Sequence, residues 1–156
     1  MSKVMVIGAG PAGIMAAITA AENHKVILVD GNEKIAKKLF ITGKGRCNIT
    51  NAKDIGDFFD YIPGNPHFLY SALYSYTNED VINMIESEGT KLKVERGGRV
   101  FPESDKSSDI IKALSKKLNK AKVDIKLNSK VTDVFFDGNV IKAVEINNNQ
   151  KNPLYL

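Results

Sequence analysis

The sequence contains no tryptophan, a single cysteine and only two histidines among its 156 residues. One thiol, Cys47, excludes an internal disulfide and a cysteine-rich metal site. His24 and His67 lie too far apart to suggest a shared metal, so we expect none. No apolar run reaches the roughly 18 residues of a membrane helix. The amino terminus carries a glycine-rich turn rather than a signal-peptide pattern. These features favour a cytoplasmic protein without a membrane partner.

The sequence also lacks a strong excess of charge of one sign. Its 22 basic and 18 acidic residues leave a formal net charge of +4. The densest basic run, residues 112–122, falls on an expected amphipathic helix and has no aromatic residues within it. Such a run is typical of a solvated helix face, so we expect no nucleic-acid partner. The overall composition, 43% hydrophobic and 26% charged, is that of an ordinary globular domain.

The first 30 residues have the pattern of a strand, a helix and a second strand. Two short apolar runs, 3–7 and 25–29, flank an alanine-rich and isoleucine-rich segment at 14–23. A crossover of this length makes the two strands parallel. A short helix is expected over 32–39, followed by a loop over 40–51.

The rest of the chain is predicted to continue as an α/β domain. Two or three short helices are expected between residues 53 and 88, the last beginning near Thr77, which has acidic residues after it. Further strands and one helix follow in the order strand, strand, helix, strand and hairpin, at 91–95, 99–101, 108–121, 123–127, 131–136 and 140–146. We therefore predict a Rossmann-like domain over 1–150 with a parallel sheet, crossover helices and a β-hairpin, incomplete at its carboxyl end, and a tail over 151–156.

The turn after the first strand reads Gly8-Ala9-Gly10-Pro11-Ala12-Gly13, a match to G-x-G-x-x-G. In a dinucleotide-binding fold the first glycine allows a tight turn, the second lets a pyrophosphate approach, and the third lets the helix pack closely. The helix amino terminus then offers N–H groups and a positive dipole end to the phosphates. A glycine turn that only packs a helix, without a ligand, is the alternative.

An acidic residue, Asp30, ends the second strand, where such folds bind the adenosine ribose. Its carboxylate can accept hydrogen bonds from both ribose hydroxyls. A 2′-phosphate would meet a like charge there, so the site disfavours NADP. The glycine motif and the acidic residue by themselves do not distinguish an FAD site from an NAD site.

A second motif, KLFITGKGRCNITN over residues 38–51, resembles the K-L-x-x-T-G-x-G-R-C-N-x-T-N loop of a bacterial family of NAD(P)/FAD-dependent oxidoreductases, the aminoacetone-oxidase-like flavoproteins. The segment RGGRVFPES over 96–104 resembles a second signature of that family. The resemblance spans residues 3–150, implies FAD as cofactor and reduction of the flavin by NAD(P)H, and suggests a small organic substrate. Members are more than twice as long, so the chain resembles their amino-terminal portion only. We expect a truncated chain, or a short protein, that is not competent as an isolated enzyme.

The two motifs together give the set of expected cofactor-binding residues. They are Gly8, Gly10, Pro11, Ala12, Gly13, Asp30, Gly31, Lys38, Thr42, Gly43, Gly45, Arg46, Cys47 and Asn48. Arg46 is expected to neutralise the pyrophosphate or the reduced flavin, with a surface ion pair as the alternative. Asn48 can donate and accept at the polar edge of the flavin ring.

Other reactive side chains have less specific expectations. Cys47 has no second thiol for a redox pair, which favours a packed, inert cysteine. Arg96, Arg99 and Glu103 are candidates to orient the flavin or a substrate, with a salt bridge in the hairpin as the alternative. No catalytic acid or base is evident.

Three functional hypotheses follow. The first is a flavoprotein oxidoreductase, or its amino-terminal portion. The second is a non-catalytic dinucleotide-binding module that needs a partner chain at an unpaired sheet edge. The third is half of an NAD-dependent dehydrogenase. A simple NAD-binding fold does not need the loop 40–51, which argues against this hypothesis.

Overall fold

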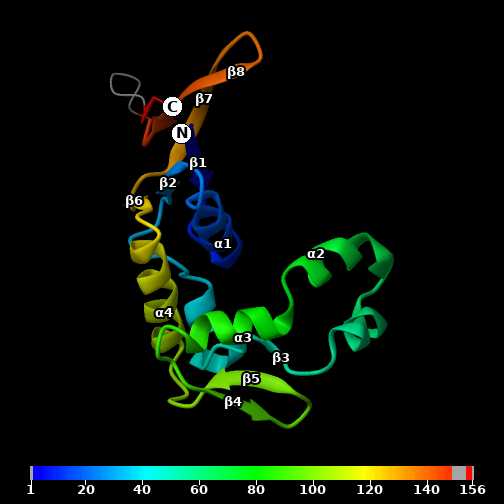
Figure 1. The fold of residues 1–156 in the computed structure, drawn as a ribbon. Coiled ribbons are helices and arrows are strands. Elements are labelled where there is room, and N and C mark those ends of the chain that lie inside the picture. The colour runs from blue at the N-terminus through cyan, green and yellow to red at the C-terminus, as the bar shows by residue number, and fades with distance from the viewer. Residues whose placement is uncertain (1, 149–153, 156) are drawn as a thin grey trace. The chain divides into compact units, whose positions relative to one another are not determined.

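The computed structural model describes residues 2–148 and 154–155, and the chain divides into two compact units (Figure 1). Unit 1 comprises residues 1–39 together with 114–156, and unit 2 comprises 40–113.

Unit 1 is built on a parallel three-stranded sheet. The strands β1 (Lys3–Ile7), β2 (Lys25–Val29) and β6 (Asp124–Lys126) lie in the order β1-β2-β6, and both pairings are parallel. The helix α1 (Pro11–Ala20) connects the first two strands. The predicted strand–helix–strand unit and its parallel pairing are confirmed. Among the described residues no strand pairs with the outer edge of β1.

The sequence of α1 suits a helix that packs closely on a sheet. Pro11 occupies its first turn, where a missing N–H breaks no helical hydrogen bond. Ile14 and Ala17 are fully buried, as are Leu28 and Val29 of β2. Burial of these apolar side chains is the main source of stability for the crossover.

The helix α4 (Ser107–Lys120) begins in unit 2 and ends in unit 1. Its apolar residues recur at helical spacing, as the sequence predicts, and four of them are buried. They are Ile110, Ala113, Leu114 and Leu118. The lysines of the predicted basic run lie on this helix and just beyond it.

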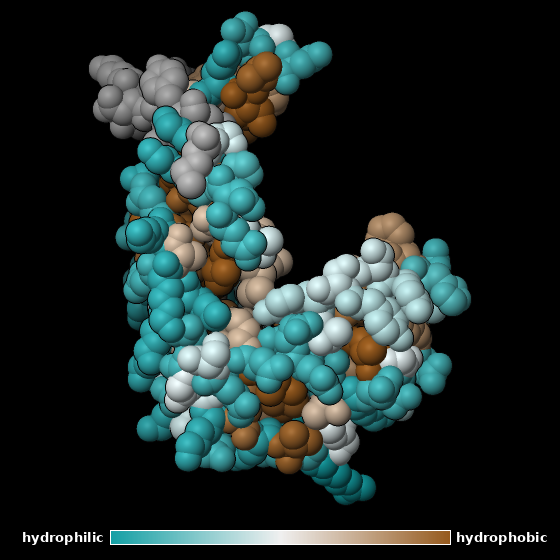
Figure 2. All heavy atoms as spheres, viewed as in Figure 1, coloured by the Kyte–Doolittle hydropathy of each residue, from teal (hydrophilic) through white to brown (hydrophobic). Residues whose placement is uncertain are grey.

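A second, antiparallel sheet completes unit 1. The predicted hairpin is confirmed as β7 (Val131–Asp137) and β8 (Val140–Ile146), which turn at Gly138 with φ +59°. The short strand β9 (Leu154–Tyr155) pairs with β8, so two residues of the expected tail add to this sheet. Residues 151–153 and 156 of that tail lie outside the described residues. Figure 2 shows hydrophobic side chains at the surface of the hairpin, where Phe136 and Val140 are exposed.

Unit 2 contains a small sheet and several short helices. The sheet order is β3-β5-β4, formed antiparallel by β3 (Thr50–Asn51), β5 (Arg99–Pro102) and β4 (Leu92–Glu95). The predicted strand pair about Gly97 and Gly98 is thereby confirmed. The helical segments are η1 (Leu39–Gly45), η2 (Ile55–Tyr61), η3 (Pro66–Leu69), α2 (Tyr70–Ser75) and α3 (Asn78–Glu86).

The helix α3 begins where the sequence predicts, because Thr77 and Asp80 form a capping box. The Thr77 hydroxyl oxygen accepts from the Asp80 N–H at 3.2 Å, and the Asp80 carboxylate accepts from the Thr77 N–H at 2.7 Å. Two orphan N–H groups of the first turn are satisfied in this way.

The predicted helix over 32–39 is wrong. Residues 31–38 form bends and turns, and Ala36 adopts a left-handed conformation with φ +54°. The reason is a tertiary contact: the Ala36 N–H donates to the Ala9 carbonyl oxygen at 2.7 Å. Ile35 and Ala36 are both buried, so the segment folds against the glycine-rich loop instead of along a helix axis.

Within the described residues no helix is long and apolar enough to cross a membrane.

Candidate functional site

The loop between β1 and α1 is shaped by glycines with different tasks. Gly8 has φ +102°, a region that other residues rarely adopt, and its N–H donates to the Val29 carbonyl oxygen at 2.7 Å. A Cβ at Gly13 would collide with the Gly8 carbonyl oxygen. A Cβ at Gly10 would meet nothing within 4 Å. Gly8 and Gly13 are therefore required by the fold, whereas Gly10 leaves an open space above the helix amino terminus.

The first turn of α1 provides hydrogen-bond donors beside that space. The first helical hydrogen bond runs from the Ile14 N–H to the Gly10 carbonyl oxygen, at 2.9 Å. Pro11 has no N–H, and the N–H groups of Ala12 and Gly13 precede that bond. Together with the dipole of the helix they can bind an anion such as a phosphate.

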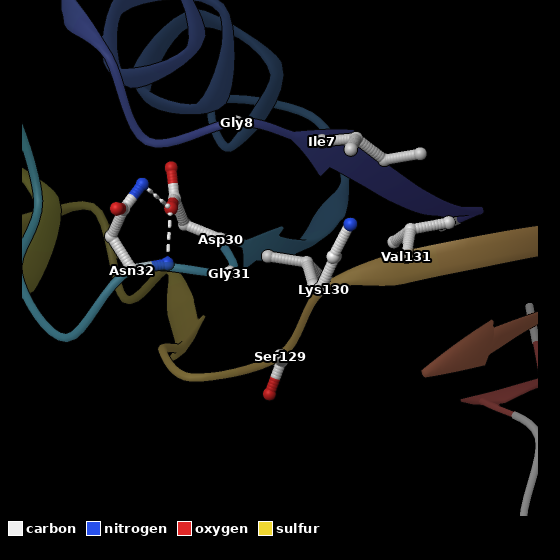
Figure 3. Close-up of a pocket in the computed structure, with 9 residues that line it drawn as sticks. Ile7, Gly8, Asp30, Gly31, Asn32, Ser129, Lys130 and Val131 are labelled. Carbon is white, nitrogen blue, oxygen red and sulfur yellow. Dashed lines mark hydrogen bonds between the residues drawn. The ribbon is translucent and has the colours of Figure 1, made fainter. Parts of the chain in front are cut away.

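Asp30 is fixed beside this loop by three N–H donors. Its Oδ2 accepts from the Ala9 N–H at 2.6 Å. Its Oδ1 accepts from the backbone N–H and the side-chain amide of Asn32, each at 2.7 Å (Figure 3). Burial alone would raise the pKa of Asp30, but these hydrogen bonds and the nearby Lys37 ammonium lower it below its ordinary value. The carboxylate is ionised at neutral pH and can accept further hydrogen bonds.

A pocket of about 440 Å³ opens at the carboxyl ends of β1 and β2, with Asp30 in its wall. Three segments line it, residues 7–8, 29–32 and 129–131. In Figure 3, Asp30 and Asn32 lie to the left of Gly31, and Ile7, Lys130 and Val131 lie to its right. The side chain of Ile7 is 57% exposed here, which is unusual for a strand of the central sheet. Ile7 and Val131 thus give the pocket an apolar part, while Asp30, Asn32, Ser129 and Lys130 contribute polar groups to its lining.

The third wall, residues 129–131, was missed by the sequence analysis. It follows β6, the third parallel strand, and the carboxyl ends of parallel strands meet at one edge of the sheet. That rule could have identified the segment. Gly31 belongs to this contact as well, since a Cβ on it would lie 3.1 Å from the Lys130 Cβ.

Asn147 holds this wall in position from the end of β8. Its side-chain oxygen accepts from the Lys130 N–H at 2.9 Å, and its side-chain amide donates to the Asn128 carbonyl oxygen at 2.8 Å. Its own N–H donates to the Lys130 carbonyl oxygen at 2.8 Å. Both backbone polar groups of Lys130 are therefore used, and its side chain is the part that faces the pocket.

The predicted second loop, residues 42–48, lies in unit 2 and has a compact backbone. Gly43, Lys44, Gly45 and Cys47 all have positive φ, from 55° to 85°. Two hydrogen bonds close the loop, from the Cys47 N–H to the Thr42 carbonyl oxygen at 3.0 Å and from the Arg46 N–H to the Gly43 carbonyl oxygen at 3.2 Å.

Arg46 adopts the alternative that the sequence left open, an ion pair. Its Nη1 lies 2.8 Å from Glu95 Oε1 and 3.3 Å from Asp105 Oδ1, and its guanidinium lies 4.2 Å from the centroid of the Phe101 ring. These carboxylates raise the pKa of Arg46, with the Glu95 hydrogen bond as the largest cause.

Two neighbours in the loop have different surroundings. Cys47 is fully buried, as predicted for a packed cysteine, and burial raises the pKa of its thiol. Asn48 is exposed, and the carbonyl oxygens of Thr50 and Val100 orient its amide nitrogen toward them, at 3.1 and 3.2 Å. The amide oxygen is then the acceptor that Asn48 can offer to a ligand.

The remaining candidates lie at the surface. Lys38 is exposed. In the β4–β5 hairpin the Arg99 Nε donates to the Arg96 carbonyl oxygen at 3.2 Å. The salt bridge expected among Arg96, Arg99 and Glu103 is absent from the described part of the chain, where the ion pairs of this hairpin involve Lys93 and Glu95 instead. Within the same residues no cluster of histidine, cysteine or carboxylate side chains could hold a metal ion.

The structure thus brings the predicted residues together in two groups. Gly8 to Gly13 meet Asp30 and Gly31 in unit 1, and Thr42 to Asn48 form one closed loop in unit 2.

Curated relatives match most of this chain. A 3-dehydro-bile acid delta(4,6)-reductase of Clostridium scindens is 34% identical over 128 residues, which is 80% of this chain and 31% of the relative. A ribosomal RNA dihydrouridine synthase of Haemophilus influenzae is 34% identical over 134 residues, 85% of this chain and 33% of the relative. The chain spans about a third of the length of these relatives.

Solved structures share the fold at lower identity. An open conformation of a flavocytochrome c3 fumarate reductase superposes with a TM-score of 0.63 at 22% identity, covering 98% of this chain and 31% of that one. The Sdh1 complex of Mycobacterium smegmatis has a TM-score of 0.64 at 18% identity, covering 93% of this chain and 31% of that one.

The model of the HI0933-like protein Rossmann domain matches residues 2–154. This match covers nearly the whole chain and agrees with the fold, the glycine-rich loop and the position of Asp30. The chain belongs to the HI0933-like Rossmann-domain family, an FAD-binding family of flavoprotein oxidoreductases.

Proposed function

We propose that residues 8–13, Asp30 and the adjoining pocket bind the ADP half of FAD, and that the chain is the cofactor-binding part of an oxidoreductase. The observation that carries the proposal is the hydrogen bond from the Ala9 N–H to Asp30 Oδ2, at 2.6 Å. It fixes a ribose acceptor beside a glycine loop whose second glycine faces open space.

The residues present fit the adenosine diphosphate moiety. The pyrophosphate would lie over Gly10, within reach of the N–H groups of Ala12 and Gly13. The ribose hydroxyls would donate to Asp30. The carboxylate offers about four acceptor sites and three are used, so one is free and the Asn32 amide can yield a second. The pocket of about 440 Å³ has an apolar wall that includes Ile7, which suits a purine.

The predicted roles of the other cofactor residues are part of the same proposal. By family resemblance the loop 42–48 faces the flavin, with Thr42, Gly43 and Gly45 offering backbone groups and Asn48 its amide oxygen. Lys38 precedes this loop as a solvent-exposed cation. FAD supplies hydride-transfer chemistry when bound, and the protein's part is to bind, orient and shield it.

The activity of the whole protein is a further proposal, because the chain covers about a third of its relatives. We infer that NAD(P)H reduces the flavin and that a small organic compound is the substrate. The name of the bile acid reductase supports a small substrate.

A second candidate substrate is a uridine of ribosomal RNA, which departs from the expectation of no nucleic-acid partner. The names of two relatives at 34% and 32% identity support it. Dihydrouridine in ribosomal RNA, measured by mass spectrometry with and without the gene in the source organism, separates the two candidates. If deletion of the gene removes a dihydrouridine, ribosomal RNA is the favoured substrate. If the dihydrouridine content is unchanged, the small organic substrate is favoured.

A non-catalytic module that needs a partner chain is the competing proposal, and the outer edge of β1 supports it. That edge has no strand beside it among the described residues, and an unpaired edge can accept another strand. Oxidation of NADPH by the FAD-loaded chain would favour an enzyme, whereas FAD binding that requires an added partner chain would favour the module.

The first experiment is the visible absorption spectrum of the purified chain, followed by heat release and chromatography of any chromophore. Stoichiometric FAD supports the proposal. Titration calorimetry with FAD, ADP and NADP then tests the adenosine site, and we expect ADP to bind and NADP to bind more weakly. A colourless protein that also fails to bind added FAD would show that this chain does not form the site.

A further inference from the structure

We propose that Arg46 is a positioning residue, which holds the loop 42–48 in shape through Glu95 and Asp105 and is not itself the counter-ion of the cofactor. The inference rests on the proposed function in one respect, that this loop contributes to FAD binding. It replaces the direct electrostatic role that the sequence suggests for Arg46.

The contacts of Arg46 lead away from the loop and into the β4–β5 hairpin and the turn after it. Glu95 ends β4 and Asp105 lies beyond β5, and both carboxylates lie within 3.3 Å of the same Nη1 atom. The guanidinium also covers the ring of Phe101, which is only 2% exposed. Ion pairing and cation–π contact together fix the direction of the side chain.

The carboxylates are shared with a second cation. Lys93 Nζ lies 2.7 Å from Asp105 Oδ2 and 3.7 Å from Glu95 Oε1. Arg46, Lys93, Glu95 and Asp105 therefore form a closed set of two positive and two negative charges. Because the set is neutral, Arg46 leaves little net positive charge for a phosphate or a reduced flavin. Moving it toward a ligand would leave both carboxylates with Lys93 alone.

The loop depends on such external support. Lys44 and Cys47 are non-glycine residues with φ +57° and +62°, conformations that persist only when the surroundings impose them. The loop also packs tightly, since a Cβ at Gly43 would lie 3.1 Å from Phe101 Cε1. Arg46 contacts that same ring, so it connects the strained backbone to the hairpin that supports it.

Two single variants separate positioning from direct contact. Arg46→Met removes the cation. Glu95→Gln keeps the cation but removes the carboxylate that lies nearest to it. If Arg46 positions the loop, both variants weaken FAD binding by similar factors of about tenfold, and the double variant is little worse than either one. If Arg46 contacts the cofactor directly, Glu95→Gln keeps or tightens FAD binding while Arg46→Met weakens it, which would overturn the proposal. Unchanged binding in both variants overturns it as well.

Cys47 gives a second measurement that needs no cofactor. It is the only cysteine and is fully buried in this loop, so its rate of reaction with DTNB reports opening of the loop. We expect Arg46→Met and Glu95→Gln to accelerate the reaction about tenfold at unchanged far-ultraviolet circular dichroism. High salt should accelerate it in the unmodified chain and not in Arg46→Met, because salt screens ion pairs and spares apolar packing.

Matched variants control for general destabilisation. Glu103→Gln removes a carboxylate just after β5 that has no ion pair in the described part of the chain, and should leave the DTNB rate unchanged. Glu95→Asp should restore part of the protection that Glu95→Gln loses. If the unmodified chain binds no FAD, the proposed function fails while the DTNB rates still decide the positioning role. Equal rates in all variants would refute it.

Discussion

The backbone N–H of Ala9 donates to Asp30 Oδ2 at 2.6 Å, and so joins the glycine-rich loop to the end of the neighbouring strand. The same loop residue accepts from Ala36 through its carbonyl oxygen at 2.7 Å. Ala9 is 1% exposed, and its bond to Asp30 is partly buried. The phosphate and ribose parts of the proposed site are thus held at a fixed separation before any nucleotide binds, which reduces the entropic cost of binding.

Replacement of Gly10 by valine should abolish FAD binding while the fold is kept. Gly10 has φ −76° and ψ 174°, which valine can adopt, and its Cβ would enter open space. The side chain would occupy the position proposed for the pyrophosphate and should lower affinity at least about a hundredfold. Loss of stability should stay near 1 kcal/mol, the size of a helix-cap effect. Titration calorimetry and thermal unfolding measure the two effects; retained FAD affinity would argue against the phosphate site.

Replacement of Gly13 by alanine should have the opposite pattern, a loss of fold rather than of ligand alone. The new Cβ would overlap the Gly8 carbonyl oxygen, which is backbone and cannot rotate away. We expect a loss of about 3 kcal/mol or more in the free energy of unfolding. Urea unfolding followed by circular dichroism tests this, and a variant as stable as the parent would show that α1 can move away from β1.

Binding of adenosine nucleotides should weaken as the pH falls into the acid range. The folded pKa of Asp30 lies below its ordinary value, because its hydrogen bonds and Lys37 outweigh the effect of burial. Because the folded pKa is lower than the unfolded pKa, the carboxylate contributes fully to stability when the pH is above its unfolded pKa. This contribution is lost as the pH falls through the folded pKa. At neutral pH Asp30 is therefore charged, and ADP affinity should be flat there.

The variant Asp30→Asn tests the same group at constant pH. It should weaken ADP binding, and it should remove the fall of ADP affinity at acid pH, the acid limb of the pH profile. Asn32→Ala serves as its control, because it frees an acceptor site on Asp30 and should leave affinity equal or higher. An acid limb that persists in Asp30→Asn would assign the titration to another group.

The sequence predicted those parts of the fold that short-range physics determines. The parallel pairing of β1 with β2 follows from the length of the crossover, and the hairpin around Gly138 follows from its turn residues. The start of α3 follows from Thr77 and the acidic residues after it. In each case the deciding interactions lie within a few residues, or within one structural unit of known handedness.

The sequence did not predict the tertiary contacts that decide three other features. The helical pattern over 32–39 is overridden because Ala36 bonds to Ala9, far away in the sequence. Arg46 pairs with Glu95 and Asp105, and nothing local indicates that these carboxylates lie nearer to it than a phosphate would. The pocket wall at 129–131 depends likewise on β6 pairing with β2.

Removal of the capping hydroxyl in Thr77→Ala should destabilise unit 2 by about 1 kcal/mol. The hydroxyl both accepts from the Asp80 N–H and donates to the Asp80 carboxylate, at 3.2 and 2.8 Å. The hydrogen bond from the Thr77 backbone N–H, and after it the one from the hydroxyl, lower the pKa of Asp80, so its part of the cap should be lost as the pH falls through the acid range. Thr77→Ser should retain the stability, as measured by urea unfolding. Equal destabilisation by both replacements would implicate the methyl group instead.

The wall of the pocket at 129–131 should depend on the side chain of Asn147. That side chain makes two hydrogen bonds to the segment, from the Lys130 N–H and to the Asn128 carbonyl oxygen. Because Asn147 has φ +55°, Asn147→Gly removes these bonds without backbone strain, whereas Asn147→Ala adds the cost of a left-handed alanine. We expect Asn147→Gly to lower ADP affinity more than it lowers stability, and Asn147→Ala to lower both. Exchange of the Lys130 amide proton, followed by NMR, should accelerate in both variants. If ADP affinity is unchanged while that exchange accelerates, the segment 129–131 forms a wall of the pocket but does not contact the nucleotide.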